Sequence, residues 1–366
     1  MKIAILAEKN SSLSRCVKPI AEFHGATGAI TALTVHPHMI VSRHFSYPRG
    51  LKIKDYPLAK EQAFKPIDFN SRDMMRRDVW KSVTMADGTG WHATITEETC
   101  SVVKGPNGRW TTIDPADGIR DAEKIVVFAD PDPSGCLSMA MILDQILPLG
   151  RNDPRVEVVH AWQQDEDYIR EALARSGSFE TTSERYLRAG RAKQRFDYNY
   201  ALNANVILRM IQQDIGIPAD TPPLSKYALQ TLYHMRTLTE PKSHGSLFAT
   251  MQKWRGTGRY APKAGVGIGS PSSRDDIVTQ IVEAGLADTV ALKRANGSPQ
   301  KALRISTDGL RLLDALHPDC EDADLPFRID AWQAMTEDEA AARIDRYIKT
   351  FFGKMKRFAE REGAAA

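Results

Sequence analysis

Three short apolar runs limit what this chain can fold into. They are KIAILA at residues 2–7, KIVVFA at 124–129 and VEVVHA at 156–161, and each has the length of a buried strand. The segment GCLSMAMILDQIL at 135–147 follows the second run and is predicted to be a helix. A strand, a helix and a strand at this spacing indicate a parallel sheet. The sequence therefore predicts an α/β domain built on a parallel sheet.

The rest of the chain is predicted to be mainly helical. The segment SSRDDIVTQIVEAGL predicts a helix with Ser272 or Ser273 as its N-cap. TVALKR, ANGSPQ and KALRIS then predict a strand, a turn and a strand, so that a helix precedes a two-stranded ribbon as in winged-helix domains. Thr336 and Glu339 predict a capping box before a long final helix. We expect an α/β domain over residues 1–162, a helical connector over 163–220 and a winged-helix-containing helical domain over 221–366.

Composition excludes several classes of protein. Lys and Arg number 49 against 46 Asp and Glu, a net charge of +3, so a nucleic-acid site has to come from local clustering of charge. The four cysteines form no C-x-x-C pair, which argues against a disulfide framework or a zinc knuckle and fits a reducing cytoplasm. We expect no membrane span, because no apolar stretch approaches the roughly 20 residues required. No P-loop is present, so we expect no nucleotide cofactor.

Two polar segments follow predicted strands, where an open parallel sheet binds its ligands. In AEKNSS, Glu8 and Lys9 could act as a proton donor and a phosphate clamp, or could form a surface ion pair. In DPDPSG, Asp130 and Asp132 are oxygen ligands of the kind that suits Mg²⁺. The alternative is a tight turn in which Ser134 caps the next helix. The DPDPSG segment by itself leaves both interpretations open.

Together, KIAILAEKNSSLSR and VVFADPDPSG resemble the Toprim domain of type IA DNA topoisomerases, which is a Rossmann-like α/β domain. In that family a Glu-Lys pair follows the first strand and a D-x-D-x-E-G motif follows a later one. RFDYNYALNANVILR resembles the next family motif, with Arg195, Asp197 and Asn203 matching it. GVGIGSPSSRDDIVTQIVEAGLA resembles the segment that opens the family's winged-helix region, and Ser273 and Arg274 match it. The order of the motifs is most similar to that of topoisomerases of the III type.

The resemblance implies a set of roles. Glu8 would support proton transfer, Lys9 would steady the scissile phosphate, and Asp130 and Asp132 would bind Mg²⁺. The basic and aromatic segment KWRGTGRYAPK independently suggests contacts to single-stranded DNA. The predicted DNA-contacting residues are Lys9, Arg195, Asn203, Arg209, Lys253, Arg255, Arg259, Lys263, Ser272, Ser273 and Arg274.

Three departures from the family pattern stand out. Ser134 occupies the position of the third acid, so metal binding should be weaker. Val206 replaces the arginine that closes the Asn motif, and Arg209 is a nearby substitute. About sixty residues replace the long arch that carries the nucleophilic tyrosine, and they hold no Y-P-R motif. A Y-P-R does occur at Tyr47, inside the Toprim region, where chance is the favoured explanation and a catalytic Tyr47 the alternative.

The sequence leaves two functions open. The chain is either a compact topoisomerase-like enzyme that uses Tyr47, a water or a tyrosine from a partner chain, or a catalytically degenerate DNA-binding module of a DNA-processing assembly. A partner protein would then supply the missing gate or tyrosine. In both cases we expect a cytoplasmic, nucleoid-associated protein that binds DNA, preferentially single-stranded.

Overall fold

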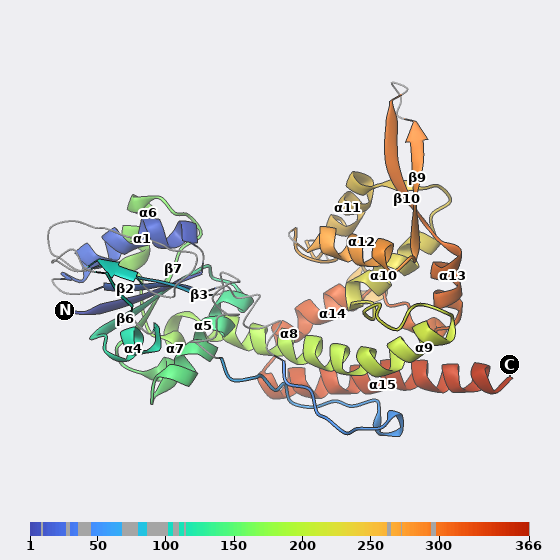
Figure 1. The fold of residues 1–366 in the computed structure, drawn as a ribbon, viewed down its shortest axis with the longest axis horizontal. Coiled ribbons are helices and arrows are strands. Elements are labelled where there is room, and N and C mark those ends of the chain that lie inside the picture. Colours follow the sequence, from blue (N-terminus) through green and yellow to red (C-terminus); the bar gives the residue numbers. More distant parts are fainter. Residues whose placement is uncertain are drawn as a thin grey trace. The chain divides into compact units, whose positions relative to one another are not determined.

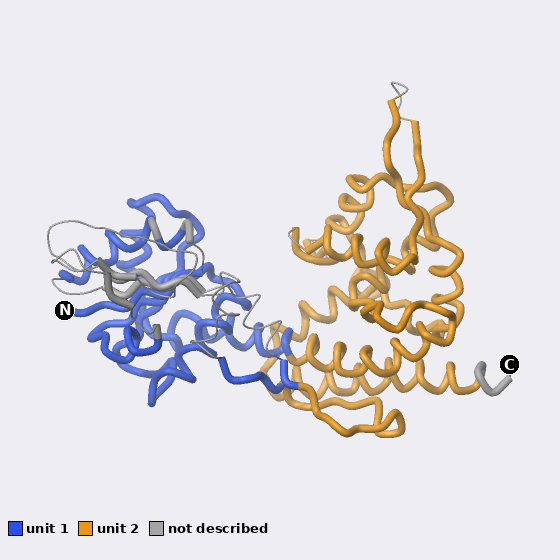
Figure 2. Tube along the Cα trace, in the orientation of Figure 1, with its two compact units in different colours: residues 1–46, 63–194 blue, residues 47–62, 195–366 orange. Residues whose placement is uncertain are grey.

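The computed structural model describes residues 1–8, 10–26, 30–35, 45–67, 80–85, 102–104, 110–112, 115–261, 265–271, 273–293 and 298–365. The chain forms two compact units, shown in Figure 2. Unit 1 comprises residues 1–46 and 63–194, and unit 2 comprises residues 47–62 and 195–366. No helix among these residues combines the length and the apolar character that crossing a membrane requires.

Unit 1 is built on a five-stranded sheet in the order β3-β2-β1-β6-β7. Its strands are β1 (Ile3–Ala7), β2 (Ile30–Val35), β3 (Trp80–Met85), β6 (Lys124–Ala129) and β7 (Val156–His160). Strands β2, β1, β6 and β7 pair in parallel, and β3 is an antiparallel edge. The three predicted strands and their parallel pairing are therefore confirmed. A separate short ribbon pairs β4 (Val102–Lys104) with β5 (Trp110–Thr112).

Helices cover both faces of this sheet, as Figure 1 shows. Alternate strand residues bury on opposite faces: Ile3 and Ile5 pack with α1 (Asn10–Phe23) and α6 (Glu166–Leu173), whereas Ala4 and Leu6 pack with the helices of the other face. The helices of that second face are α4 (Pro115–Arg120), α5 (Pro133–Ile146), α7 (Phe179–Thr182) and the start of α8 (Glu184–Asn203). Burial on both faces explains why the strands read as continuous apolar runs.

Unit 2 is mostly helical. Its helices are the end of α8, a π-helical turn at Ala204–Leu208, α9 (Arg209–Asp214), α10 (Lys226–Arg236), α11 (His244–Gln252), α12 (Arg274–Glu283), α13 (Thr307–Asp314), α14 (Leu325–Gln333) and α15 (Glu337–Ala365). A three-stranded sheet in the order β8-β10-β9 joins β8 (Lys242–Ser243), β9 (Ala287–Lys293) and β10 (Pro299–Ile305). The antiparallel β9–β10 pair follows α12, which confirms the predicted helix and ribbon.

Two predicted helix starts have different outcomes. The capping box before α15 is confirmed, because Thr336 Oγ1 accepts the Glu339 N–H and Glu339 Oε2 accepts the Thr336 N–H. Ser273 stands at the N-cap position of α12, but its hydroxyl donates to the Ser270 carbonyl and caps no helical N–H. Ser272 lies outside the described residues.

Two asparagines of α8 hold residues 47–62 in unit 2. Asn203 accepts the Leu58 N–H at 2.8 Å and donates to the Leu58 carbonyl at 2.7 Å. Asn199, one turn earlier, makes the same two bonds to Lys60, at 2.8 and 2.7 Å. Each amide thus imitates the backbone of a neighbouring strand, and both side chains are fully buried.

Replacing Asn203 with Ala should destabilise the protein by about 2–4 kcal/mol, because it leaves the N–H and carbonyl of Leu58 without partners, at roughly 1–3 kcal/mol each. Urea denaturation would measure the change, and limited proteolysis should cut within residues 47–62 earlier than in the wild type. Asn205→Ala, at an exposed position on the same stretch of helix, is the matched control. Equal stability of the two variants would contradict the proposed clamp.

Candidate functional site

The pairing of β1 with β6 brings two distant polar segments to one edge of the sheet. The strands are parallel neighbours with Ala7 opposite Phe128, so their carboxyl ends lie together. The Glu8 N–H donates to the Phe128 carbonyl at 3.3 Å and extends the pairing by one residue. Glu8 therefore stands beside Asp130, although 122 residues separate them in the sequence.

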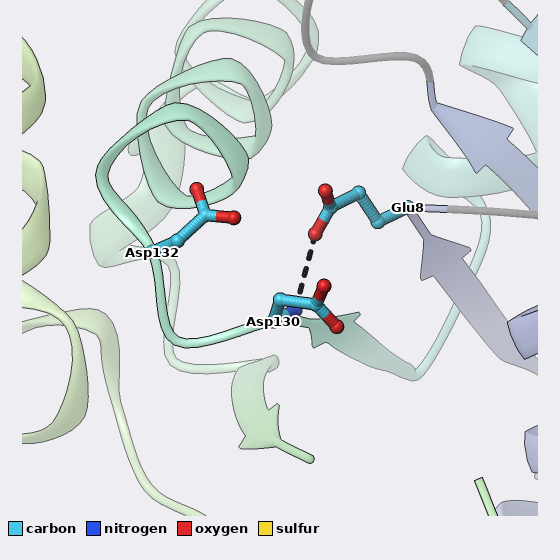
Figure 3. A group of neighbouring side chains, drawn as sticks. All are labelled: Glu8, Asp130 and Asp132. Atoms are coloured by element: carbon cyan, nitrogen blue, oxygen red, sulfur yellow. Dashed lines mark hydrogen bonds between the residues drawn. The ribbon is translucent and has the colours of Figure 1, made fainter. Parts of the chain in front are cut away.

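Three carboxylates converge at this edge. Glu8, Asp130 and Asp132 each offer one oxygen, and these oxygens all lie within 4.8 Å of one another. Figure 3 shows the Glu8 side chain extended toward the loop that carries both aspartates. Its Oε2 accepts the Asp130 N–H at 3.1 Å, and the residue is only 7% exposed. We name these three residues the carboxylate cluster.

Asp132 also begins helix α5. Its Oδ1 accepts the N–H groups of Ser134 at 2.7 Å and Gly135 at 2.8 Å, and Pro133 occupies the first helical position. The alternative in which Ser134 caps the helix is therefore wrong, because Asp132 is the N-cap. Asp132 can take part in both the turn and a ligand site. Its Oδ1 accepts the two helical N–H groups, and its Oδ2 is not used by the cap.

Gly135 makes room for the carboxylate of Glu8. A Cβ at this position would lie 2.9 Å from Glu8 Oε2, closer than real Cβ contacts allow. The first turn of a helix also favours negative charge, because its backbone N–H groups point outward along the axis. A glycine in that turn lets the Glu8 carboxylate approach the positive end of α5.

This arrangement could hold a metal ion. Carboxylate oxygens are the ligands that hard divalent cations prefer, and three negative charges this close repel one another unless a cation offsets them. The sequence predicted Asp130 and Asp132 as the ligands and assigned Glu8 to proton transfer. In the structure Glu8 supplies a third carboxylate beside these two. The adjacency of the first two predicted strands was the signal that could have revealed this.

The side chain of Tyr47 packs against a second tyrosine. Tyr47 belongs to unit 2 and stacks on Tyr198, with ring centroids 5.5 Å apart and an interplanar angle of 2°. Burial, together with the nearby Tyr198 and Asp197, raises the pKa of Tyr47 to about 12. The side chain therefore carries its proton at neutral pH, as in an ordinary packed tyrosine.

Three of the predicted DNA-contacting residues form contacts inside unit 2. Arg195 makes a two-pronged ion pair with Asp345, through Nε at 2.9 Å and Nη2 at 2.8 Å. The Nε of Arg274 donates to the Ile268 carbonyl at 3.2 Å. Asn203 holds Leu58 as described above.

Other predicted contacts are more open. Lys253 and Arg255 are exposed and line a pocket of about 620 Å³ in unit 2, together with Trp254. The guanidinium of Arg259 lies over the ring of Tyr260, 4.7 Å from its centroid. Arg209 is half-buried, and its Nε has no hydrogen-bond partner within the part of the chain that is described. Lys9 and Lys263, like Ser272, fall outside that part.

Neither a scan against models of protein families nor a search of the curated proteins finds a match for this chain. Its function is therefore inferred from the residues of the site.

Two substitutions of Asp132 should separate its two roles. Asp132→Ala removes the cap and should be less stable than Asp132→Asn by about 1 kcal/mol without metal. Asp132→Asn keeps a good cap and relieves charge repulsion, so its stability without metal should match or exceed that of the wild type. Thermal denaturation with and without Mn²⁺ tests both.

The wild type should gain about 2.7 kcal/mol when Mn²⁺ is present at a hundred times its dissociation constant, because the ion binds only the folded state. Both variants should lose most of this gain. A Mn²⁺-dependent stabilisation that survives in both would show that the carboxylate cluster does not bind the ion.

Proposed function

We propose that this chain is a type IA topoisomerase-like protein that acts on single-stranded DNA and holds Mg²⁺ at Glu8, Asp130 and Asp132. The observation that carries the proposal is the convergence of these three carboxylates at the carboxyl edge of a parallel sheet. In this proposal the sheet domain of unit 1 is a Toprim domain. Its Glu-Lys segment follows the first strand and its D-x-D segment follows a later one, as in the resemblance, and these two strands are neighbours in the sheet.

Residues of this chain would position the DNA strand. The N–H groups at the start of α5 and the cap of Asp132 fix the loop that carries both aspartates. The buried carboxylate of Glu8 would move a proton to or from the reacting oxygen. Mg²⁺, when bound, would offset the charge of the phosphodiester.

The order of elements in unit 2 supports a winged helix. The helix α10 is followed by β8, α11, α12 and the β9–β10 ribbon, and β8 pairs with β10 to complete a small sheet. Helix α10 packs against both α12 and β10. This is the order of helices and strands expected of a winged-helix domain.

The charge on α12 favours single-stranded DNA over a duplex. A winged-helix protein that reads duplex DNA inserts this helix into the major groove. Here its first turn exposes Asp275 and Asp276, which phosphates would repel. The exposed cations Lys253, Arg255 and Arg259, with aromatic neighbours, suit a single strand instead.

A second candidate function is a catalytically degenerate DNA-binding module. The serine at position 134 favours it, because the family places an acid there. The pKa of Tyr47, which burial raises to about 12, favours it too, because the phenol then keeps its proton at neutral pH. A partner protein would supply the tyrosine or the gate in a larger assembly. Such a protein would associate with the nucleoid.

The test is incubation with labelled oligothymidine and with negatively supercoiled plasmid, with and without Mg²⁺. The wild type should bind the strand and should cleave it or form a detergent-stable covalent adduct only with Mg²⁺. Asp130→Asn should lower this reaction at least about 100-fold, because metal stabilisation of the reacting charge is worth several kcal/mol. Asp121→Asn, an exposed acid of the same unit, is the control.

Tyr47→Phe identifies the nucleophile, since loss of the adduct would assign it to Tyr47 and retention would assign it elsewhere. Binding without cleavage at any metal concentration would contradict the enzyme and leave the DNA-binding module. Absence of single-strand binding would contradict both functions.

A further inference from the structure

A polar pocket of unit 1 borders the loop that carries Asp130 and Asp132. It has a volume of about 260 Å³, and Pro131, between the two aspartates of the cluster, forms part of its wall. His160, at the end of β7 and opposite Ala129 of β6, forms another part. The pocket therefore shares part of its wall with the loop that carries two of the candidate metal ligands.

Aromatic rings line much of the pocket. Trp162, Tyr168 and Tyr186 all contribute. Trp162 is 66% exposed, the largest exposed fraction among the large hydrophobic side chains that the structure describes. An indole left this open at the ligand-binding edge of a sheet is a stacking surface for a flat ring.

The positive charge of the pocket comes from two arginines, Arg175 and Arg185. The guanidinium of Arg185 lies over the ring of Tyr186, 4.5 Å from its centroid. Within the described residues, no carboxylate pairs with Arg175 or Arg185. Arg170 of the same region, in contrast, is neutralised by Glu22 and Glu166. The pocket therefore combines flat apolar surfaces with guanidinium charge that an anion could balance.

Contacts on both ring nitrogens hold the ring of His160, which forms part of the pocket lining. Its Nδ1 is 3.3 Å from the Ala129 carbonyl and its Nε2 is 3.0 Å from the Ser183 hydroxyl. The ring of Tyr186 meets it edge-on, with centroids 5.5 Å apart. Both ring nitrogens are engaged, so the pocket is preformed on this side.

We propose that this pocket takes one nucleobase of the bound single strand, stacked on Trp162, with the adjoining phosphate on Arg175 and Arg185. The inference rests on the proposed function, because it names where that site holds a base next to the reacting phosphate. The volume supports one base: it lies below the roughly 300–1,000 Å³ of pockets that enclose whole small molecules. The aromatic rings would hold the base, and the two guanidinium groups, which pair with no carboxylate among the described residues, would hold the phosphate.

The test compares two strands of equal length and charge, oligothymidine and a fully abasic strand, by fluorescence anisotropy without Mg²⁺. Trp162→Ala should weaken binding of oligothymidine about 5- to 150-fold, the range for loss of one base–aromatic stack, and should leave the abasic strand unchanged. Arg185→Gln should weaken both strands alike, since both carry the phosphates. Trp162→Phe should restore part of the preference for oligothymidine. Phe23→Ala, an exposed aromatic of the same unit outside the pocket, is the control.

The outcomes separate the two proposals. If the wild type binds oligothymidine and Trp162→Ala binds it equally well, or loses both strands equally, the base pocket is overturned and the proposed function stands. If the wild type binds neither strand, the proposed function falls and the pocket with it.

Discussion

The site depends on one backbone register, the parallel alignment of β1 with β6. Because Ala7 lies opposite Phe128, the next residue of β1 meets the loop after β6, and the Glu8 N–H bonds to the Phe128 carbonyl. The Glu8 carboxylate then accepts the Asp130 N–H. A shift of one residue would turn Glu8 to the other face of the sheet, since side chains alternate along a strand. The apolar burial on both faces that fixes the register therefore also fixes the carboxylate cluster.

Helix α5 ties this register to the rest of the cluster. Asp132 begins the helix, Gly135 leaves space for Glu8, and Gly190 of α8 lets that helix approach the same turn, where a Cβ would lie 2.5 Å from the Pro133 carbonyl. A short segment thus serves as a helix cap and a packing surface, and it carries two candidate metal ligands. The tight turn and a candidate metal site, which were alternatives for the DPDPSG sequence, are therefore compatible in one structure.

The sequence predicted what depends on local pattern. The strands β1, β6 and β7 were predicted because buried parallel strands are short apolar runs, and the aspartates because they directly follow one of them. It did not reveal contacts between distant residues: the carboxylate of Glu8 meets Asp130, 122 residues away, and Arg195 pairs with Asp345, 150 residues away. The path of residues 47–62 depends in the same way on Asn199 and Asn203, whose partners no periodicity indicates. Local sequence patterns predict helices, strands and the residues that follow a strand. The partners of polar side chains depend on how distant segments pack together.

The most direct test of the account is a Mn²⁺ titration followed by electron paramagnetic resonance, comparing the wild type with Glu8→Gln. The amide keeps an oxygen that can accept the Asp130 N–H and removes one negative charge from the cluster, so the fold should be retained. We expect one Mn²⁺ bound per wild-type chain and an affinity at least about tenfold lower in the variant, because a candidate ligand is lost. Equal Mn²⁺ affinity in the two proteins, or no binding by the wild type, would contradict the claim that this sheet edge is a metal centre.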